Sequence, residues 1–404
     1  MKRFLIIILI VLAIAGVVYA GYTLSTKKNA GNGTATTTPG GLPEATPIIG
    51  GEGQPGGATS PETAAGLPAL GTEQLSSFGV ASDTSIIAAG LDGKIFKISA
   101  DGSVSPLSAS SLDNFVSAAF SYDAQKVVLS FGTSDSRQFS VFDIATRSWT
   151  PLAVGVVSAS WKPRSHVLAY ATEKSGLKTV FSLDMDVAKA KPSQLFSLRM
   201  EDLVLDWAAP GKISISQKPS GLVNGSVFVF DTAKKTFSSP VIDVPGAALL
   251  WDSAASRALE FFGSQTARGG DFRIVSASGE TINKFQFLTL PEKCLFVPEA
   301  APTSTISTST KIKAVPVPEE KNIICAVPSN QTDFTQKTLP DEYYKRSFFT
   351  ADNIYKINLD DGTASLILSA TGRSLDASSP LISGDKLFIL NRADGKIYSL
   401  PLPK

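Results

Sequence analysis

The sequence has one histidine, His166, among 404 residues. Histidine-based metal sites and the Ser–His–Asp and Cys–His catalytic sets all need histidines near other reactive groups. A single histidine therefore argues against a histidine-based metal site or catalytic set. We expect His166 to be a solvated turn residue. The acidic stretches at 184–186 and 360–362 lack the alternating oxygen ligands of a calcium loop. We expect no metal and no cofactor.

Cysteine is nearly as scarce, with only Cys294 and Cys325. They fall in two neighbouring candidate strands, "KCLFV" and "NIICA". An antiparallel register that joins Pro298 to Lys321 would place the two cysteines opposite each other. Opposed side chains lie about 5 Å apart, which suits a disulfide, and an exported compartment permits one. Two buried free thiols are the alternative, and no histidine lies nearby in sequence to support a catalytic cysteine.

The chain also lacks an excess of charge of either sign. It has 37 basic and 36 acidic residues, a net charge of +1, and no basic block. Sequence-independent binding to nucleic acid phosphates therefore has no support. Hydrophobic residues make up 43% of the chain and charged residues 18%, which is enough apolar material for a large core. The length would allow two or three ordinary domains, but a repeat fold of this size can be one unit.

Residues 1–28 are dominated by an uncharged apolar run from Phe4 to about Leu24, preceded by two basic residues. About 20 such residues can cross the hydrocarbon core of a membrane as a helix. The flanking charges favour a cytoplasmic N-terminus. We therefore predict a transmembrane signal-anchor helix that binds the chain to a membrane. A cleaved signal peptide is the alternative, because small residues at Val18 and Ala20 suit a signal peptidase.

Residues 29–70 change in character and are rich in Gly, Thr, Pro and Ala. They show no apolar period and cannot bury a core, which predicts a flexible, disordered linker. An ordered loop packed on the domain is the alternative, and the length of the segment disfavours it.

From residue 71 to residue 404, one short strand pattern recurs. It begins with "KIFKI" at 94–98 and ends with "KIYSL" at 396–400. Most steps are roughly 40 to 48 residues, which is near the period of a four-stranded propeller blade. Each recurrence has companion strands, one of them strongly apolar and one polar. The count predicts an all-β, seven-bladed β-propeller, whose last blade lacks a fourth strand. We expect the segment 70–75 to complete that blade and close the ring.

Two insertions interrupt the sixth unit. The first, around residues 299–321, is a low-complexity loop between its first and second strands. The second joins its second and third strands, on the propeller face that most often carries ligands. It combines aromatic and cationic side chains of the types found at binding hot spots. These candidate binding residues are Tyr343, Tyr344, Lys345, Arg346, Phe348 and Phe349. The alternative is that the aromatics cover the top of the blade as local core.

The turns before the apolar strands carry a family resemblance. Phe120–Asp123 ("FSYD"), Trp161–Pro163 ("WKP") and Trp207–Pro210 ("WAAP") each place an aromatic residue before a turn and an apolar strand. This pattern resembles the WD40-like repeats of the TolB family of exported bacterial propellers. The Gly-His and Trp-Asp pairs of eukaryotic WD40 repeats are missing. The resemblance implies a prokaryotic propeller outside the cytoplasm that acts as a scaffold or binder. With the predicted anchor, we expect the chain in the plasma membrane, with its C-terminal domain extracytoplasmic. It carries over no catalytic residue.

These features together predict a non-enzymatic scaffold that binds a protein or a cell-envelope polymer. A structural part of an envelope assembly machine or pilus would differ only in its partner. The rival hypothesis is a glycan hydrolase or lyase that uses paired carboxylates in the central channel. Asp202, Asp206 and Asp376, near the starts of candidate strands, are the residues that could point into that channel.

Overall fold

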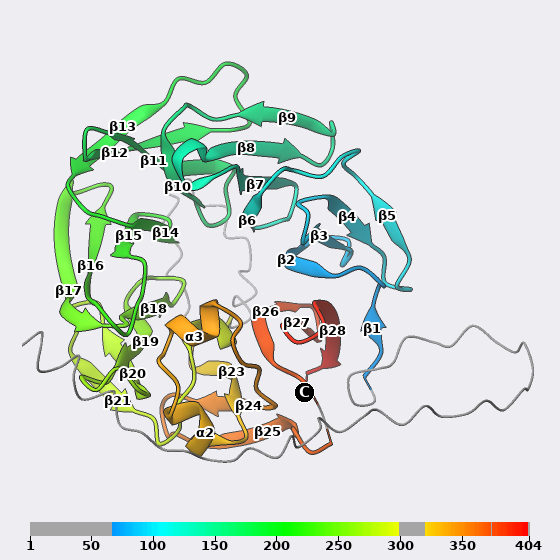
Figure 1. Ribbon diagram of the computed structural model, residues 1–404, viewed down its shortest axis with the longest axis vertical. Coiled ribbons are helices and arrows are strands. Elements are labelled where there is room, and N and C mark those ends of the chain that lie inside the picture. Colours follow the sequence, from blue (N-terminus) through cyan, green and yellow to red (C-terminus); the bar gives the residue numbers. More distant parts are fainter. Residues whose placement is uncertain (1–66, 299–319, 373, 403–404) are drawn as a thin grey trace, which may run out of the picture. The chain divides into compact units, whose positions relative to one another are not determined.

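The computed structural model describes residues 67–298, 320–372 and 374–402. They form seven four-stranded antiparallel sheets, which stand as blades around a central axis (Figure 1). The prediction of an all-β, seven-bladed propeller is confirmed. The predicted membrane helix at 1–28 and nearly all of the predicted linker at 29–70 lie outside the described residues.

Each of the first six blades uses four consecutive strands, from the channel outward. The strands of blades one to three are β2 (Leu75–Val80), β3 (Ile86–Gly90), β4 (Ile95–Ile98), β5 (Val104–Pro106), β6 (Phe115–Phe120), β7 (Lys126–Phe131), β8 (Gln138–Asp143), β9 (Ser148–Pro151), β10 (Val156–Trp161), β11 (Val167–Lys174), β12 (Leu177–Asp184) and β13 (Ser193–Leu198). The strands of blades four to six are β14 (Leu203–Ala209), β15 (Lys212–Gln217), β16 (Asn224–Asp231), β17 (Thr236–Pro245), β18 (Ala248–Trp251), β19 (Arg257–Gly263), β20 (Gly270–Ser276), β21 (Thr281–Lys284), β22 (Cys294–Val297), β23 (Asn322–Pro328), β24 (Asp352–Asn358) and β25 (Ala364–Leu368).

The seventh blade joins the two ends of the domain. Its strands are β26 (Ala377–Ser383), β27 (Lys386–Asn391), β28 (Lys396–Pro401) and β1 (Ala69–Leu70). β1 pairs antiparallel with β28, so that Ala69 lies opposite Tyr398 and Leu70 opposite Ile397. The last blade is completed from the N-terminal side of the domain, as expected, but by Ala69–Leu70 rather than by residues 70–75, and Leu75 already begins β2 of the first blade. A ring closed in this way leaves only short strand edges exposed.

The hydrophobic core lies between the blades. The second strands are the most buried, and every residue of β3 is buried, whereas every residue of the outer strands β9 and β21 is exposed. Between blades one and two, Ile87 and Ile95 of the first blade pack with Val127, Leu129 and Phe142 of the second. Similar clusters join the other neighbours. Each blade therefore buries its apolar faces only against the blades beside it.

The connections between strands alternate between the two ends of the ring. Those from the second to the third strand of a blade, and those from the fourth strand to the next blade, share one end. We call this end the loop face. It carries the short helices η2 (Ser134–Ser136), η3 (Pro291–Lys293), α2 (Gln331–Thr335) and α3 (Asp341–Tyr344).

The predicted localisation in a prokaryotic plasma membrane needs correction. Across residues 67–298, 320–372 and 374–402, no helix is long and apolar enough to cross a membrane. The α-helices there, α2 and α3, have five and four residues, far short of the roughly 20 that a bilayer core requires. We do not retain the membrane localisation.

The two cysteines form the predicted disulfide. Cys294 and Cys325 lie opposite each other on β22 and β23, with their Cα atoms 4.1 Å apart. The register continues to Val297 opposite Asn322, as the sequence predicted. The bond joins the two innermost strands of blade six, on either side of the first insertion.

Replacing both Cys294 and Cys325 by Ala is expected to lower the free energy of unfolding by roughly 2–4 kcal/mol, because the bond closes a long loop in the unfolded chain. The sequence separation of 31 residues sets the size of that loop. Chemical denaturation of the two proteins measures the difference. Two reactive thiols in the denatured, unreduced protein would contradict the disulfide.

Candidate functional site

The second insertion of blade six forms a small helical cap on the loop face. It runs from residue 329 to residue 351, between β23 and β24. Asn330 caps α2 by accepting a hydrogen bond from the backbone N–H of Asp333 at 3.0 Å. Gln331 docks the helix on the preceding connection, because its side chain accepts from Leu288 N at 2.7 Å and donates to Leu288 O at 3.1 Å. The cap is thus held by hydrogen bonds that fix its position.

A buried ionic cluster lies beneath α3. The Lys293 ammonium is 2.8 Å from Asp352 Oδ2 and 2.5 Å from Asp376 Oδ1, and all three side chains are fully buried. The guanidinium of Arg392 lies 2.5 Å from the other oxygen of Asp376. Two cations and two carboxylates therefore balance, as a buried charge set requires. Burial alone would lower the pKa of Lys293, but Asp352 and Asp376 outweigh it and raise that pKa.

Tyr343 connects the cap to this cluster. Its ring is 2% exposed and lies 3.5 Å from the Arg392 guanidinium, and Arg392 also donates a hydrogen bond to the Tyr343 carbonyl. Burial raises the pKa of Tyr343 well above its usual value. The side chain therefore anchors α3 from below and is not displayed on the surface.

The six candidate binding residues divide into two groups. Tyr343 is buried, and Phe348 is partly buried and packs against the same core. The other four, Tyr344, Lys345, Arg346 and Phe349, are exposed on the loop face. The local-core alternative thus describes the first group, while the second group is available to a partner. A binding role for the candidates stays a prediction.

Tyr343→Ala is expected to lower the free energy of unfolding by about 3–5 kcal/mol, because it empties a large buried site beside charged groups. Tyr344→Ala is the matched control and should cost less, about 1–2 kcal/mol, since that side chain is 40% exposed and loses one hydrogen bond, with Glu292. Equilibrium denaturation measures both variants. Equal losses would mean that the two tyrosines do not differ in this way.

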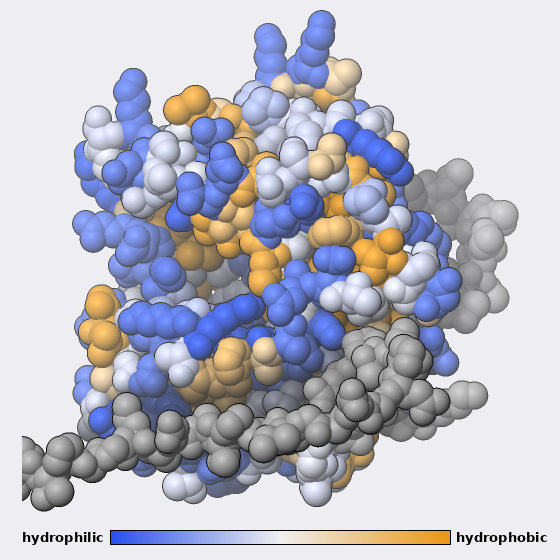
Figure 2. Space-filling view, turned by 45° about the vertical axis from the view of Figure 1, so that its right-hand side comes forward, coloured by the Kyte–Doolittle hydropathy of each residue, from blue (hydrophilic) through white to orange (hydrophobic). Residues whose placement is uncertain are grey.

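Exposed large apolar side chains gather on the loop face. Among the described residues, six lie in its connections: Leu91, Val154, Leu222, Val223, Tyr344 and Phe349. The connections at the opposite end carry two, Tyr122 and Val187. An oblique view of the domain shows apolar residues on the surface in patches bordered by hydrophilic ones (Figure 2). Patches of this kind mark interaction surfaces on soluble domains.

The three proposed channel carboxylates are not brought together. Asp376 is held by Lys293 and Arg392 in the buried cluster. Asp202 precedes β14 and Asp206 lies within it, four residues further along. Their Cα atoms are therefore about 13 Å apart along an extended strand. Desolvation by the protein around the channel raises the pKa of Asp206 to about 6, although its side chain is reached by solvent.

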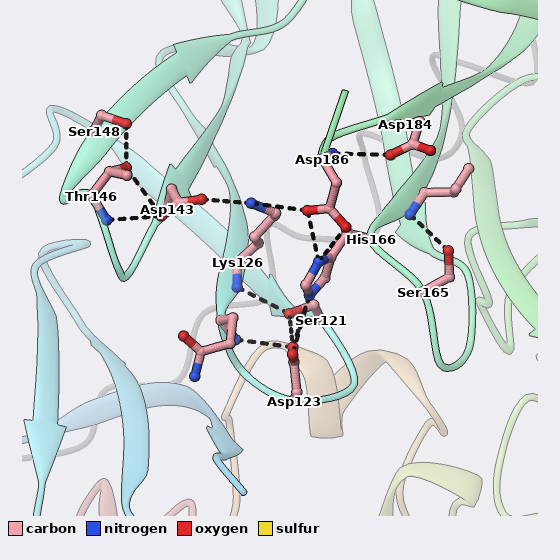
Figure 3. A network of polar contacts seen from close by, with 12 residues as sticks. Ser121, Asp123, Lys126, Asp143, Thr146, Ser148, Ser165, His166, Asp184 and Asp186 are labelled. Atoms are coloured by element: carbon pink, nitrogen blue, oxygen red, sulfur yellow. Dashed lines mark hydrogen bonds and ion pairs between the residues drawn. The ribbon is translucent and has the colours of Figure 1, made fainter. Parts of the chain in front are cut away.

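The opposite end of the ring carries a second polar network (Figure 3). His166, in the turn between β10 and β11, lies with Nε2 3.0 Å from Asp123 and Nδ1 2.9 Å from Asp186. Lys126 approaches Asp143 at 2.5 Å and Asp186 at 3.4 Å. The network bridges blades two and three. The prediction that His166 is solvated is wrong, because its side chain is only 15% exposed.

The electrostatics of this network couple it to pH. Burial alone would lower the pKa of His166, but its hydrogen bonds with Asp123 and Asp186 outweigh burial and raise it. Burial alone would raise the pKa of Asp123, and the hydrogen bond with His166 leads the effects that lower it. The imidazolium thus stabilises the fold below its unfolded pKa of 6.5 and loses that effect as pH rises through the folded value. The carboxylate contributes above its unfolded pKa of 3.8.

His166→Gln is expected to destabilise the domain more at about pH 5.5 than at about pH 8.5, because only the imidazolium gains from Asp123 and Asp186. The neighbouring charge of Lys126 is the same at both values. Denaturation curves of variant and parent at the two pH values give the comparison. A difference that is independent of pH, or larger at the higher value, would show that the charged form contributes nothing.

No metal-binding group of three or more His, Cys, Asp or Glu side chains occurs in the part of the chain that the structure describes. The residues of the two networks are instead paired with each other.

Comparisons with solved structures agree with this architecture. Oligogalacturonate lyase from Vibrio parahaemolyticus aligns at a TM-score of 0.53 and 10% identity, over 83% of this chain and 91% of that chain. The β-propeller domain of Cps50 (Swd1) from Myceliophteria thermophila aligns at 0.51 and 10% identity, over 83% and 99%. The chain is a β-propeller. At such identities the likeness concerns the fold alone.

TolB from Acinetobacter baumannii also matches, at 14% identity and a TM-score of 0.36, over 54% of this chain. The chain covers 64% of TolB, which is less than two thirds of its length. Neither likeness assigns a role to this chain. No family model matches the sequence, and no curated protein does.

Proposed function

We propose that this propeller is a non-enzymatic scaffold that binds a partner protein through its loop face. The observation that carries the proposal is the concentration of exposed apolar side chains in the connections at one end of the ring, six against two among the described residues. A surface that exposes valine, leucine and aromatic residues loses unfavourable contact with water when a protein covers it. A cell-envelope polymer, the other partner considered, would offer mainly hydroxyl groups to these side chains.

The exposed part of the blade-six cap belongs to this surface. Tyr344, Lys345, Arg346 and Phe349 combine the aromatic and cationic groups that dominate binding energy at protein interfaces. The buried cluster below α3 supports them, because it fixes the cap before a partner arrives. A pre-ordered surface loses less conformational entropy on binding than a mobile one.

A kinship with TolB-type repeats is part of the same proposal. Its support is the turn at Ser121–Asp123, which follows an aromatic residue and precedes the buried strand β7. There Asp123 accepts hydrogen bonds from the Ser121 hydroxyl at 2.8 Å and from Gln125 N at 3.1 Å. This turn chemistry explains why the repeat favours Ser and Asp at these positions.

An enzyme that cleaves glycans is the second candidate, and Asp206 is the observation that favours it. A channel-facing carboxylate with a pKa raised to about 6 resembles a general acid. A second carboxylate within about 10 Å would be needed for hydrolysis, and Asp202 and Asp376 do not supply it. Release of products from glycan oligosaccharides by the parent, but not by Asp206→Asn, would favour this candidate over the scaffold.

The scaffold proposal is tested by photo-crosslinking in cells that make the protein. A photoreactive amino acid at Leu222 or Tyr344 on the loop face is expected to yield one discrete adduct with a partner. The matched controls are Tyr122 and Val187, exposed apolar residues at the opposite end. Adducts from the controls alone, or from neither set, would overturn the proposal.

A further inference from the structure

Two adjoining pockets cross the loop face over blades two to four. The polar pocket has a volume of about 460 Å³ and lies over the starts of β10 and β14. The apolar pocket has a volume of about 650 Å³ and lies over β8, β9 and the connection to β10. They share five lining residues: Ser134, Arg137, Val156, Val157 and Glu173. The two pockets thus adjoin across these shared residues, and together they form one groove.

A tight loop shapes the wall between the pockets. Gly132 has φ +93°, and a Cβ there would lie 2.6 Å from the carbonyl oxygen of Ser136. Only glycine therefore allows the chain to turn through η2 and return to β8. The turn leaves Arg137, the residue after η2, exposed at the boundary and lining both pockets.

The polar pocket has cationic groups without partners. Lys178 is 7% exposed and pairs with Glu173 at 3.1 Å, so these two charges cancel. Arg137 and Lys218 also line the pocket, and among the described residues neither has an ion-pair partner. Asp202 is the one remaining carboxylate. The lining therefore carries a net positive charge and two open sets of hydrogen-bond donors.

The apolar pocket beside it supplies a different contact. Phe131, Phe139 and Leu152 are partly buried in its lining, and Val154 at its rim is fully exposed. A guanidinium binds a carboxylate through paired hydrogen bonds, while the apolar lining favours an aliphatic or aromatic side chain. An acidic sugar would offer charge to the first pocket but no apolar group to the second.

We infer that this groove binds an extended segment of the partner protein, with a carboxylate in the polar pocket and a large apolar side chain in the apolar pocket. The inference rests on the proposed protein-binding function and names the chemistry of the bound segment. The carboxylate belongs either to an Asp or Glu side chain or to the C-terminus of the partner. In both cases Arg137 and Lys218 are its ligands.

The test is a selection of displayed random peptides of about twelve residues against the full chain. We expect selected peptides to carry a carboxylate close to a large apolar residue. Their dissociation constant should rise at least about tenfold with Arg137→Glu/Lys218→Glu, since charge-assisted hydrogen bonds are lost. Lys189→Glu is the matched control, an exposed cation between β12 and β13 at the opposite end of the ring, and should leave binding within about twofold.

Synthetic peptides then identify the source of the carboxylate. Loss of binding on Asp-to-Asn or Glu-to-Gln exchange assigns it to a side chain, and loss on C-terminal amidation assigns it to the terminus. The inference is overturned if no peptide is selected, if the peptides lack a carboxylate, if the double variant binds them unchanged, or if acidic oligosaccharides bind instead. Photo-crosslinks from Leu222 or Tyr344 that persist in such a case would leave the proposed function standing without this groove.

Discussion

Packing between blades is the interaction on which the rest of this structure depends. A four-stranded sheet with buried residues on both faces of its middle strands has nothing within itself to cover them. In every pair of neighbours, one blade supplies part of that cover, as Ile87 and Ile95 do against Val127 and Leu129. In an open row, the first and last blades would each have one uncovered apolar face. The two-residue strand β1 is therefore important despite its length. It completes the seventh sheet and lets the seventh blade cover the first.

The closed ring also separates two kinds of surface. All connections of the loop face emerge at one end, because the strands alternate in direction and the blades follow one another head to tail. That end can vary in length and composition without disturbing the packing, which is why the blade-six cap and the groove over blades two to four are tolerated there. At the opposite end, polar contacts such as His166 with Asp123 join blades instead.

A cluster of buried charged side chains lies where the blade-six cap is attached to the ring. Lys293, Asp352, Asp376 and Arg392 come from the sixth and seventh blades and meet under α3. A neutral set of this kind is weak as a source of stability, but it fixes geometry, since any displaced member would leave an unpaired buried charge. We attribute to it the orientation of Tyr343 and, through it, of the exposed residues Tyr344 and Phe349.

The sequence by itself determined the repeat, the blade number, the ring closure and the cysteine register. The first three follow from local periodicity, that is, from alternating apolar residues and turn residues at fixed intervals. The cysteine register follows because one antiparallel pairing of the two strands places the cysteines opposite each other. Two of the innermost strands are not evident in the sequence. β2 ("LSSFGV") and β26 ("ASSPLIS") are rich in small and polar residues, and β26 contains Pro380, so neither shows a clear apolar alternation.

Only the tertiary structure decided which side chains face solvent and which charges meet. Tyr343 and Tyr344 are adjacent in sequence and identical in type, yet one is buried and the other exposed, because Arg392 from another blade lies under the first. His166 is separated from Asp123 by 43 residues, and no local pattern links them. Arg137 and Lys218 come from different blades and line one pocket. Such contacts depend on how the blades pack side by side. The periodicity of the sequence predicts the strands, but it does not specify which side chains of different blades meet.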